Sequence, residues 1–227
     1  MLSPPPIYPA DQWGIPWLRV DVQPTSLALP IIPWGSVARS TRHGGTWCFY
    51  CDDFRFGDWR RLAGKIMASQ PAAITEVNFS HFYESARAEV LWGIYRRRLI
   101  SRTLQDVGIA PWVDLCIPHE FADLTLLGVP KGWRAYATRG FDARAEETRA
   151  EYAMAAQHAG CEPLMLVYGG GRRVEAIARE LRCLYVPARV SEIATAKRSY
   201  VKRQDAQQGM LLEVTDTPIS PEFRLTT

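Results

Sequence analysis

Several features that would assign a function at once are missing from the sequence. No apolar run reaches the roughly 18 residues that a membrane-spanning helix needs, and the N-terminus lacks the basic and apolar regions of a signal peptide. The chain contains no G-x-S-x-G elbow, no H-E-x-x-H motif and no Walker A loop, and its four histidines are dispersed. We therefore expect a cytoplasmic protein without a membrane partner, and no reaction is assigned by motif.

Cysteine and lysine are also scarce. Five scattered cysteines are typical of reduced thiols, and the one C-x-x-C pair, Cys48 and Cys51, lies in an apolar run without a second pair. We expect two buried side chains there rather than a metal or redox centre. Lys and Arg together number 27, of which only four are Lys, and the net charge is +3. Arginine suits phosphate recognition, but a GC-rich genome produces the same excess, and we favour that origin for most of them.

Proline is concentrated at one end of the chain. Eight of the sixteen prolines lie in the first 33 residues. Because proline fixes φ and removes a backbone donor, we expect residues 1–35 to form an extended arm. Trp13, Trp17 and Trp34 would dock this arm on the body by burying their rings.

From residue 47 onward, short apolar runs alternate with helical patterns. Six strands are expected, over residues 47–51, 73–79, 109–116, 134–138, 163–168 and 183–186. Such alternation is typical of a parallel sheet. Residues 27–32 and 210–214 would raise the count to eight.

The fold class predicted from this rhythm is α/β, with strand–helix units forming a closed or incomplete (β/α) barrel. An open doubly wound sheet is the alternative. The α/β domain would span residues 36–195, and residues 196–227 would be a basic segment that could complete the sheet.

Polar residues gather where the predicted strands end. They are Asp52, Asp53, Asn78, Ser80, Asp114, Thr138, Arg139 and Tyr168. The carboxyl ends of parallel strands meet at one edge, where ligands bind, although any strand that reaches water also ends in polar residues. Asp52, Asp53 and Asp114 are the candidate catalytic residues, as a general base or as ligands of a divalent metal, and aspartates at such turns also act as caps.

Glycines and arginines supply two further candidates. The loop Gly169, Gly170, Gly171 and Arg172 precedes a helix, so it is either a phosphate cradle or a flexible turn. Arg97 lies in the middle of the apolar stripe of a long helix over about residues 84–106. A buried charge needs a partner, so we predict that Arg97 is buried and paired with Asp52, Asp53 or Asp114. Arg98 and Arg102 lie on another face and are expected in solvent.

Five short blocks resemble a known family. They are FYCDDFRF (49–56), NFS (78–80), YRRR (95–98), GVPKG (128–132) and VYG (167–169). In this order they resemble the family called domain of unknown function 4417, which is found in bacteria and their phages, and the resemblance covers about residues 45–170. It implies a phage or mobile-element setting and no activity. The family usually has Asp where this chain has Asn78, so a catalytic role of that carboxylate would be altered here.

Three functions remain open on this evidence. The first is binding or processing of a phosphorylated or nucleotide-like ligand at the strand ends, with Asn78, Ser80, Arg139 and Tyr168 among the ligand-binding residues. The second is nucleic-acid binding through Arg172, Arg173 and the basic run 197–203. The third is binding of a host protein by an exposed apolar patch. The modest net charge favours the first.

Overall fold

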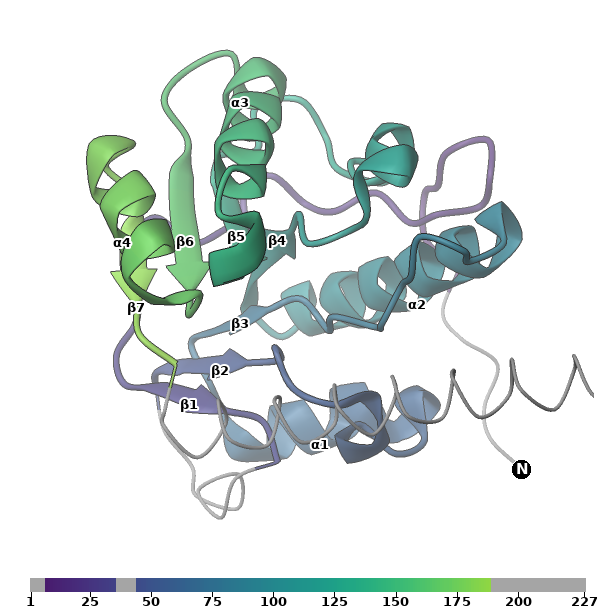
Figure 1. Ribbon diagram of the computed structural model, residues 1–227. Coiled ribbons are helices and arrows are strands. Elements are labelled where there is room, and N and C mark those ends of the chain that lie inside the picture. Colours follow the sequence, from purple (N-terminus) through teal and green to yellow (C-terminus); the bar gives the residue numbers. More distant parts are fainter. Residues whose placement is uncertain (1–6, 36–43, 189–227) are drawn as a thin grey trace, which may run out of the picture. The chain divides into compact units, whose positions relative to one another are not determined.

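The computed structural model describes residues 7–35 and 44–188 (Figure 1). Residues 7–35 and 44–187 belong to one compact unit. The strand expected at 210–214 and the basic segment 196–227 lie outside the described residues.

Seven strands form one sheet in which every neighbouring pair is parallel. They are β1 (Ile31–Pro33), β2 (Thr46–Cys48), β3 (Ala73–Thr75), β4 (Ala110–Asp114), β5 (Ala135–Arg139), β6 (Leu164–Tyr168) and β7 (Leu184–Val186). Their order in the sheet is their order in the chain. A doubly wound sheet would reverse its strand order partway, so the barrel-like prediction is confirmed and the alternative is wrong.

Four α-helices and several short 3₁₀ turns connect the strands. The helices are α1 (Leu62–Ser69), α2 (Arg87–Gln105), α3 (Glu147–Ala159) and α4 (Gly171–Glu180), and the turns are η2 (Asp53–Arg55), η3 (Trp59–Arg61), η4 (His119–Leu124) and η5 (Asp142–Arg144). Right-handed crossovers between sequential parallel strands place every helix on the same face of the sheet. In Figure 1, α1 lies beneath β1 and β2, whereas α3 and α4 lie beside β5 and β6.

A contact between two tyrosines measures how strongly the sheet curls. Tyr50 lies two residues after the end of β2, and Tyr168 ends β6, four strands away. In a flat sheet these positions would be roughly 19 Å apart. Their rings stack with centroids 5.9 Å apart. The sheet is therefore an incomplete barrel whose inner surface brings distant strand ends together.

Alternation along each strand divides the outer core from this inner surface. Trp47 and Phe49 belong to the cluster that packs with α1 and α2, while Tyr50 points to the inner side. Tyr136 and Val167 belong to a second cluster that packs with α3 and α4. Two apolar clusters thus fill the space between the outer face of the sheet and the helices.

The N-terminal arm docks through residues other than most of those predicted. Trp34 is buried, but Trp13 and Trp17 are 57% and 40% exposed. Ile15 and Leu18 are buried in their place. The prediction for the two tryptophans was wrong because the arm turns at 12–13 and again at 20–23, and it is the smaller side chains between these turns that are buried.

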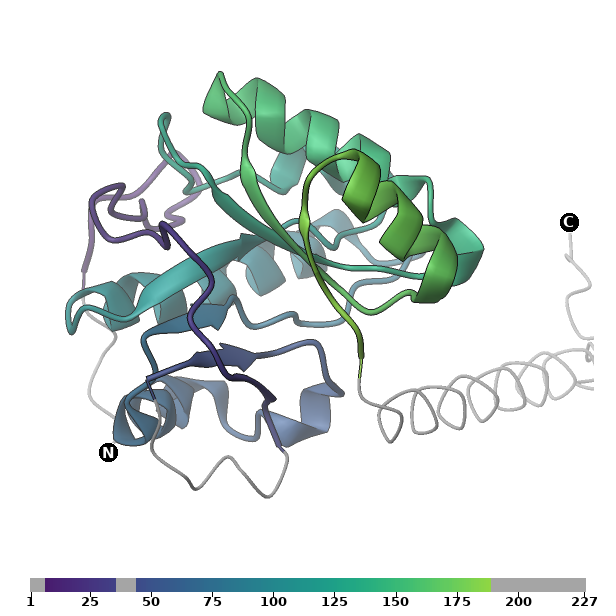
Figure 2. The ribbon, with the colours of Figure 1, turned by 90° about the vertical axis from the view of Figure 1, so that its left-hand side faces the viewer.

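Gln105 at the end of α2 fastens the arm. Its side-chain oxygen accepts from the backbone N–H of Arg19 at 2.8 Å, and its amide donates to the carbonyls of Arg19 and Val22 at 2.8 and 2.6 Å. The arm then passes Arg134, just before β5, and runs on to β1 (Figure 2). It therefore covers the amino ends of β4 and β5, opposite to the strand ends that carry the polar set.

Among the described residues, the longest helix is too polar to cross a membrane.

Candidate functional site

Asp114, at the carboxyl end of β4, is the centre of a buried polar network. Its Oδ1 accepts from the hydroxyl of Tyr50 at 3.0 Å and from the backbone N–H of Cys116 at 3.1 Å. Its Oδ2 accepts from Asn78 Nδ2 at 2.8 Å and from Arg97 Nη1 at 2.7 Å. Residues from β2, β3, β4 and α2 thus meet at one carboxylate, as parallel strand ends should.

The predicted burial and pairing of Arg97 are confirmed. Its side chain is 1% exposed, and Asp114 is its partner. Burial raises the pKa of Asp114, and the Arg97 guanidinium opposes that rise. Because every direction around the carboxylate is taken by a donor, Asp114 orients Arg97 rather than acting as a free base.

The donors around Asp114 also bear on the possible divalent metal. Both carboxylate oxygens already accept hydrogen bonds, and the neighbouring guanidinium would repel a cation. In the part of the chain that the structure describes, no three His, Cys, Asp or Glu residues form a metal-binding group. These residues do not fit a metal centre, and no role for one is derived.

A second buried ion pair lies beside the first. Arg98 is 0% exposed and pairs with Glu76, while its Nε and Nη2 donate to the carbonyls of Leu127 and Thr125 at 2.8 and 2.7 Å. Glu76 also accepts from the backbone N–H of Asp114 at 3.0 Å. The prediction that Arg98 lies in solvent was wrong because α2 is covered on two sides, by the sheet and by the segment around η4. Arg102 pairs with Asp106 and is partly exposed.

His81 was not singled out in the sequence, and its ring lies against Gly93 of α2. A Cβ added to Gly93 would overlap the Cε1 and Nε2 atoms of the imidazole. Both ring nitrogens are buried and have no hydrogen-bond partner among the described residues. Burial, followed by the charges of Arg97 and Arg96, lowers the pKa of His81 to about 3. The sequence offered one hint, a glycine inside an otherwise good helix.

Arg96 completes a group that we call the anion cluster, formed by His81, Arg96 and Arg97. The Arg96 guanidinium lies over the ring of Phe79 at 3.9 Å, and burial lowers its pKa. Its Nε has no partner in the described chain, and the same holds for Nε and Nη2 of Arg97. Two cations and a neutral imidazole therefore combine positive charge with unused hydrogen-bonding capacity.

The other predicted aspartates play smaller parts in the geometry. Asp53 accepts from the backbone N–H and the hydroxyl of Ser80, at 3.1 and 2.8 Å, and so ties the segment after β3 to η2. Asp52 precedes η2 and makes no side-chain cap. Neither joins the Asp114 network in the described structure, although Asp53 lies close enough for its charge to act on Arg96.

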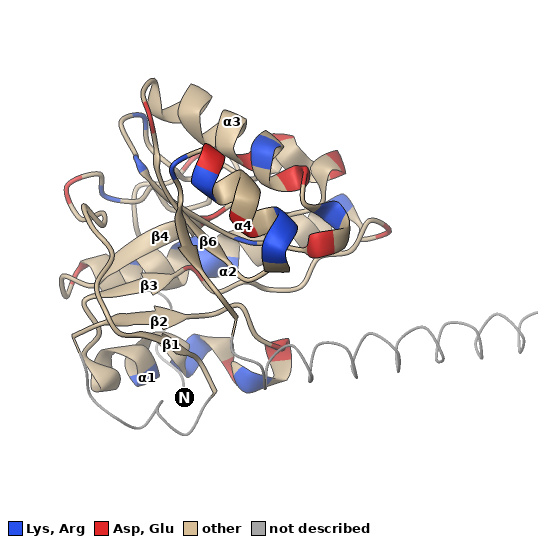
Figure 3. Cartoon of the chain, turned by 60° about the vertical axis from the view of Figure 1, so that its left-hand side comes forward, with Lys and Arg blue, Asp and Glu red and all other residues tan. Residues whose placement is uncertain are grey.

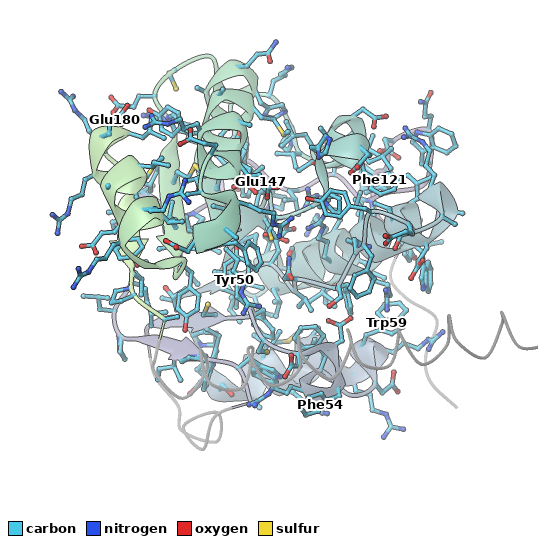
Figure 4. The ribbon with its side chains drawn as sticks, viewed as in Figure 1. Tyr50, Phe54, Trp59, Phe121, Glu147 and Glu180 are labelled. Atoms are coloured by element: carbon cyan, nitrogen blue, oxygen red, sulfur yellow. The ribbon has the colours of Figure 1, made fainter. Side chains whose placement is uncertain are left out.

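Tyr83 links the segment after β3 to α3. Its hydroxyl accepts from Arg144 Nη1 at 2.7 Å and donates to Glu147 Oε1 at 3.2 Å. Figure 4 shows Glu147 and Tyr50 on the same side of the unit. The segment 79–86, which carries both His81 and Tyr83, is thus held at both of its ends, by Asp53 and by α3.

The glycine loop has a packing explanation. A Cβ on Gly170 would lie 2.7 Å from the carbonyl carbon of Gly140, so the two turns approach too closely for side chains. Gly169 and Gly171 also have positive φ, at 74° and 77°. The loop contacts the turn after β5 rather than Asp114, and Arg172 at the start of α4 is exposed.

Tyr168 and Arg139 lie at the same strand ends. Tyr168 contacts Tyr50 as described above, and Arg139 packs over the ring of Phe141 at 5.4 Å. Burial raises the pKa of the Cys116 thiol, with Arg139 opposing. Arg139 therefore acts on the network through its charge.

Charges on the outer helices are mixed in sign (Figure 3). Arg149 pairs with Glu180 at 2.6 Å, and Arg179 pairs with Glu175 at 2.7 Å. Arg172 and Arg173 take part in neither of these pairs, and Arg173 Nη1 donates to the carbonyl of Asp142 at 3.3 Å. The basic run 197–203 lies outside the described residues.

No protein-family model, curated protein or solved structure matches the chain. The resemblance to domain of unknown function 4417 accordingly stays a prediction.

Proposed function

We propose that this protein binds a phosphorylated ligand at the carboxyl ends of its strands, through the anion cluster of His81, Arg96 and Arg97. The observation that carries the proposal is the buried Arg97 guanidinium, two of whose nitrogens have no hydrogen-bond partner among the described residues. A buried donor without an acceptor costs about 1–3 kcal/mol, and more for a charged group. Such groups call for an acceptor that is present in the working state of the protein.

A phosphoryl group supplies what the cluster lacks. Its oxygens are negatively charged acceptors, and a guanidinium can donate two parallel hydrogen bonds to them. Asp114 takes only Nη1 of Arg97, so Nη2 and Nε stay available. The carboxylate therefore sets the orientation of the arginine and leaves its free edge for the ligand.

Electrostatics favour the same kind of ligand. Burial, followed by the charges of Arg97 and Arg96, holds His81 neutral, since the imidazolium would be a third cation at the same place. An anion would reverse this effect and bring a proton to His81. Binding should then be strengthened by acid over the range in which the imidazole titrates.

The ligand would enter past the segment 79–86. Atoms of His81 are covered in the described structure, and this segment is held by Ser80 and Tyr83. Breaking the hydrogen bonds of Tyr83 would uncover the cluster without disturbing the sheet. A nucleotide-like ligand would suit the phage or mobile-element setting that the family resemblance implies.

Isothermal titration with inorganic phosphate, and with a nucleoside monophosphate and diphosphate, tests the proposal. His81→Phe keeps a ring against Gly93 and removes both nitrogens, so phosphate affinity should fall at least about tenfold. His119→Phe makes the same replacement at an exposed position and should bind as the unchanged chain does.

Two results would overturn the proposal: no heat with any of these anions, or equal affinities for the two variants. Arg97 itself is a poor first target, because its removal leaves Asp114 buried without a counter-charge at a cost of about 3–5 kcal/mol.

A further inference from the structure

Three aromatic rings lie in a row across the contact between η3 and α2. Trp92 meets Trp59 edge to face with ring centroids 5.6 Å apart, and it stacks on Tyr95 at 5.3 Å and 12°. Trp92 and Tyr95 are three residues apart on α2 and so share one helix face. Trp92 is 46% exposed. Indole surface is therefore presented to solvent on the side where Trp59 and Phe54 are labelled in Figure 4.

Two arginines flank these rings. The guanidinium of Arg60 lies over Trp59 at 4.9 Å, and that of Arg96 lies 5.7 Å from the centre of Trp92. Nine arginines of the described chain form ion pairs with Asp or Glu, and neither Arg60 nor Arg96 is among them. Arg60 is exposed beside the face of Trp59, and Arg96 lies near the charges of Asp53 and Glu89 without forming an ion pair with either.

We propose that this aromatic–arginine surface, formed by Trp59, Arg60, Trp92, Tyr95 and Arg96, binds single-stranded nucleic acid. An unpaired strand presents flat bases that stack on indole and phenol rings, together with a regular series of phosphates that arginine contacts. A duplex offers the phosphates but hides the faces of its bases. A proline-rich peptide could lie on the rings but has no anions for Arg60 and Arg96.

This surface goes beyond the proposed phosphate site and uses different side chains, apart from Arg96. It also differs from Arg172 and the glycine loop, which lie at the start of α4. Binding here should show no strong sequence preference, because every base has a face that can stack. It should weaken as salt rises, since each phosphate contact releases counterions.

The experiment measures fluorescence anisotropy of a labelled oligothymidine of about 15 nucleotides with the full chain at low salt. Trp92→Ala should weaken binding about tenfold. Trp13→Ala removes an indole from the arm that is even more exposed than Trp92, and it should leave binding unchanged. Arg60→Glu should weaken binding and flatten its salt dependence, whereas Arg172→Glu should do neither.

Three outcomes would overturn the inference. They are no binding of the oligonucleotide, equal binding by the Trp92→Ala and Trp13→Ala chains, and equal affinity for a blunt duplex of the same length. His81→Phe separates the two proposals: it should lose phosphate and keep the oligonucleotide. If Trp92→Ala weakens oligonucleotide binding and Trp13→Ala does not, this surface is supported. That result holds even if the unchanged chain binds no phosphate.

Discussion

The imidazole of His81 is kept neutral by burial and by the charges of Arg97 and Arg96, and this lowers the stability of the folded chain in acid. Its pKa in the folded chain is about 3, below the ordinary 6.5. Between about pH 6.5 and pH 3, the unfolded chain binds a proton at His81 and the folded chain does not. The contribution of His81 to stability is therefore complete above about pH 6.5 and is lost as the pH falls toward 3.

His81→Phe should remove this part of the acid sensitivity. We expect the free energy of unfolding of the variant, measured with urea, to fall less between about pH 7 and pH 4.5 than that of the unchanged chain. Saturating phosphate should shrink the difference, because an anion raises the pKa of His81. Parallel pH profiles for the two chains would contradict the assignment, and His119→Phe serves as the control.

Neighbouring arginines show what sequence can reveal at this scale. Arg97 interrupts an apolar stripe, so its burial and need for a carboxylate followed from helical spacing alone. Arg98 is one step around the helix, and its burial depends on the segment around η4 folding over α2. The spacing of apolar residues predicts a helix with one buried face. It did not indicate the second buried face of α2, which the segment around η4 covers.

Along α2, one glycine sets the position of His81. In an exposed helix interior, Gly→Ala raises stability by about 1 kcal/mol. Gly64→Ala in α1 should show this gain, because nothing lies near its Cβ. Gly93→Ala should not, since the new methyl group displaces the His81 ring.

The pair of substitutions is therefore compared by urea unfolding and by phosphate titration. We expect Gly93→Ala to weaken phosphate binding and to show no gain in stability. We expect Gly64→Ala to keep phosphate affinity and to be more stable. A stabilised Gly93→Ala chain that binds phosphate normally would show that His81 does not need its observed place.

The strands were predicted at the right places, but three of them end earlier than expected. The predicted strands run to 51, 79 and 116, whereas β2 ends at Cys48, β3 at Thr75 and β4 at Asp114. Beyond these points some backbone N–H groups donate to side chains rather than to the carbonyls of the neighbouring strand. The N–H of Phe49 donates to Thr75 Oγ1 at 2.8 Å, and the N–H of Asp114 donates to Glu76. The polar network begins where the ladder stops, and hydrophobicity alone does not mark that point.

At the scale of the whole unit, the sequence did not decide whether the sheet curls into a barrel or stays open. Continuous apolar strands fit a barrel and an open sheet equally well, and only the strand order decides between them. The convergence of Asn78 and Asp114 was predicted from parallel strands, and the pairing of Arg97 was predicted from the apolar stripe of its helix; both are observed. Asp52 and Asp53 are absent from that network because the chain leaves the sheet after Cys48 and turns into η2 at Asp53.

Gln105→Ala tests whether the arm and the site are separate parts of this unit. The substitution removes three hydrogen bonds to the arm, and we expect a loss of about 1–3 kcal/mol in the free energy of unfolding. Amide exchange of Arg19 should accelerate, because its N–H loses its acceptor. Phosphate affinity should not change, since the arm covers the amino ends of the strands.

The matched control is Gln157→Ala, an exposed glutamine on α3, which should alter neither stability nor exchange in the arm. A parallel loss of phosphate affinity in Gln105→Ala would mean that the two ends of the strands are coupled.

Because each strand pairs only with the strands next to it in the chain, the sheet can assemble in step with synthesis. Each new strand can pair with the strand that was synthesised just before it, and no gap has to be left in the sheet for a later strand. The stack of Tyr50 on Tyr168 and the contact of Gln23 in the arm with Arg134 are exceptions, because each joins residues that are made more than a hundred positions apart. A ribosome-bound chain halted before β6 would therefore carry the Asp114 network but lack the ring that closes over it.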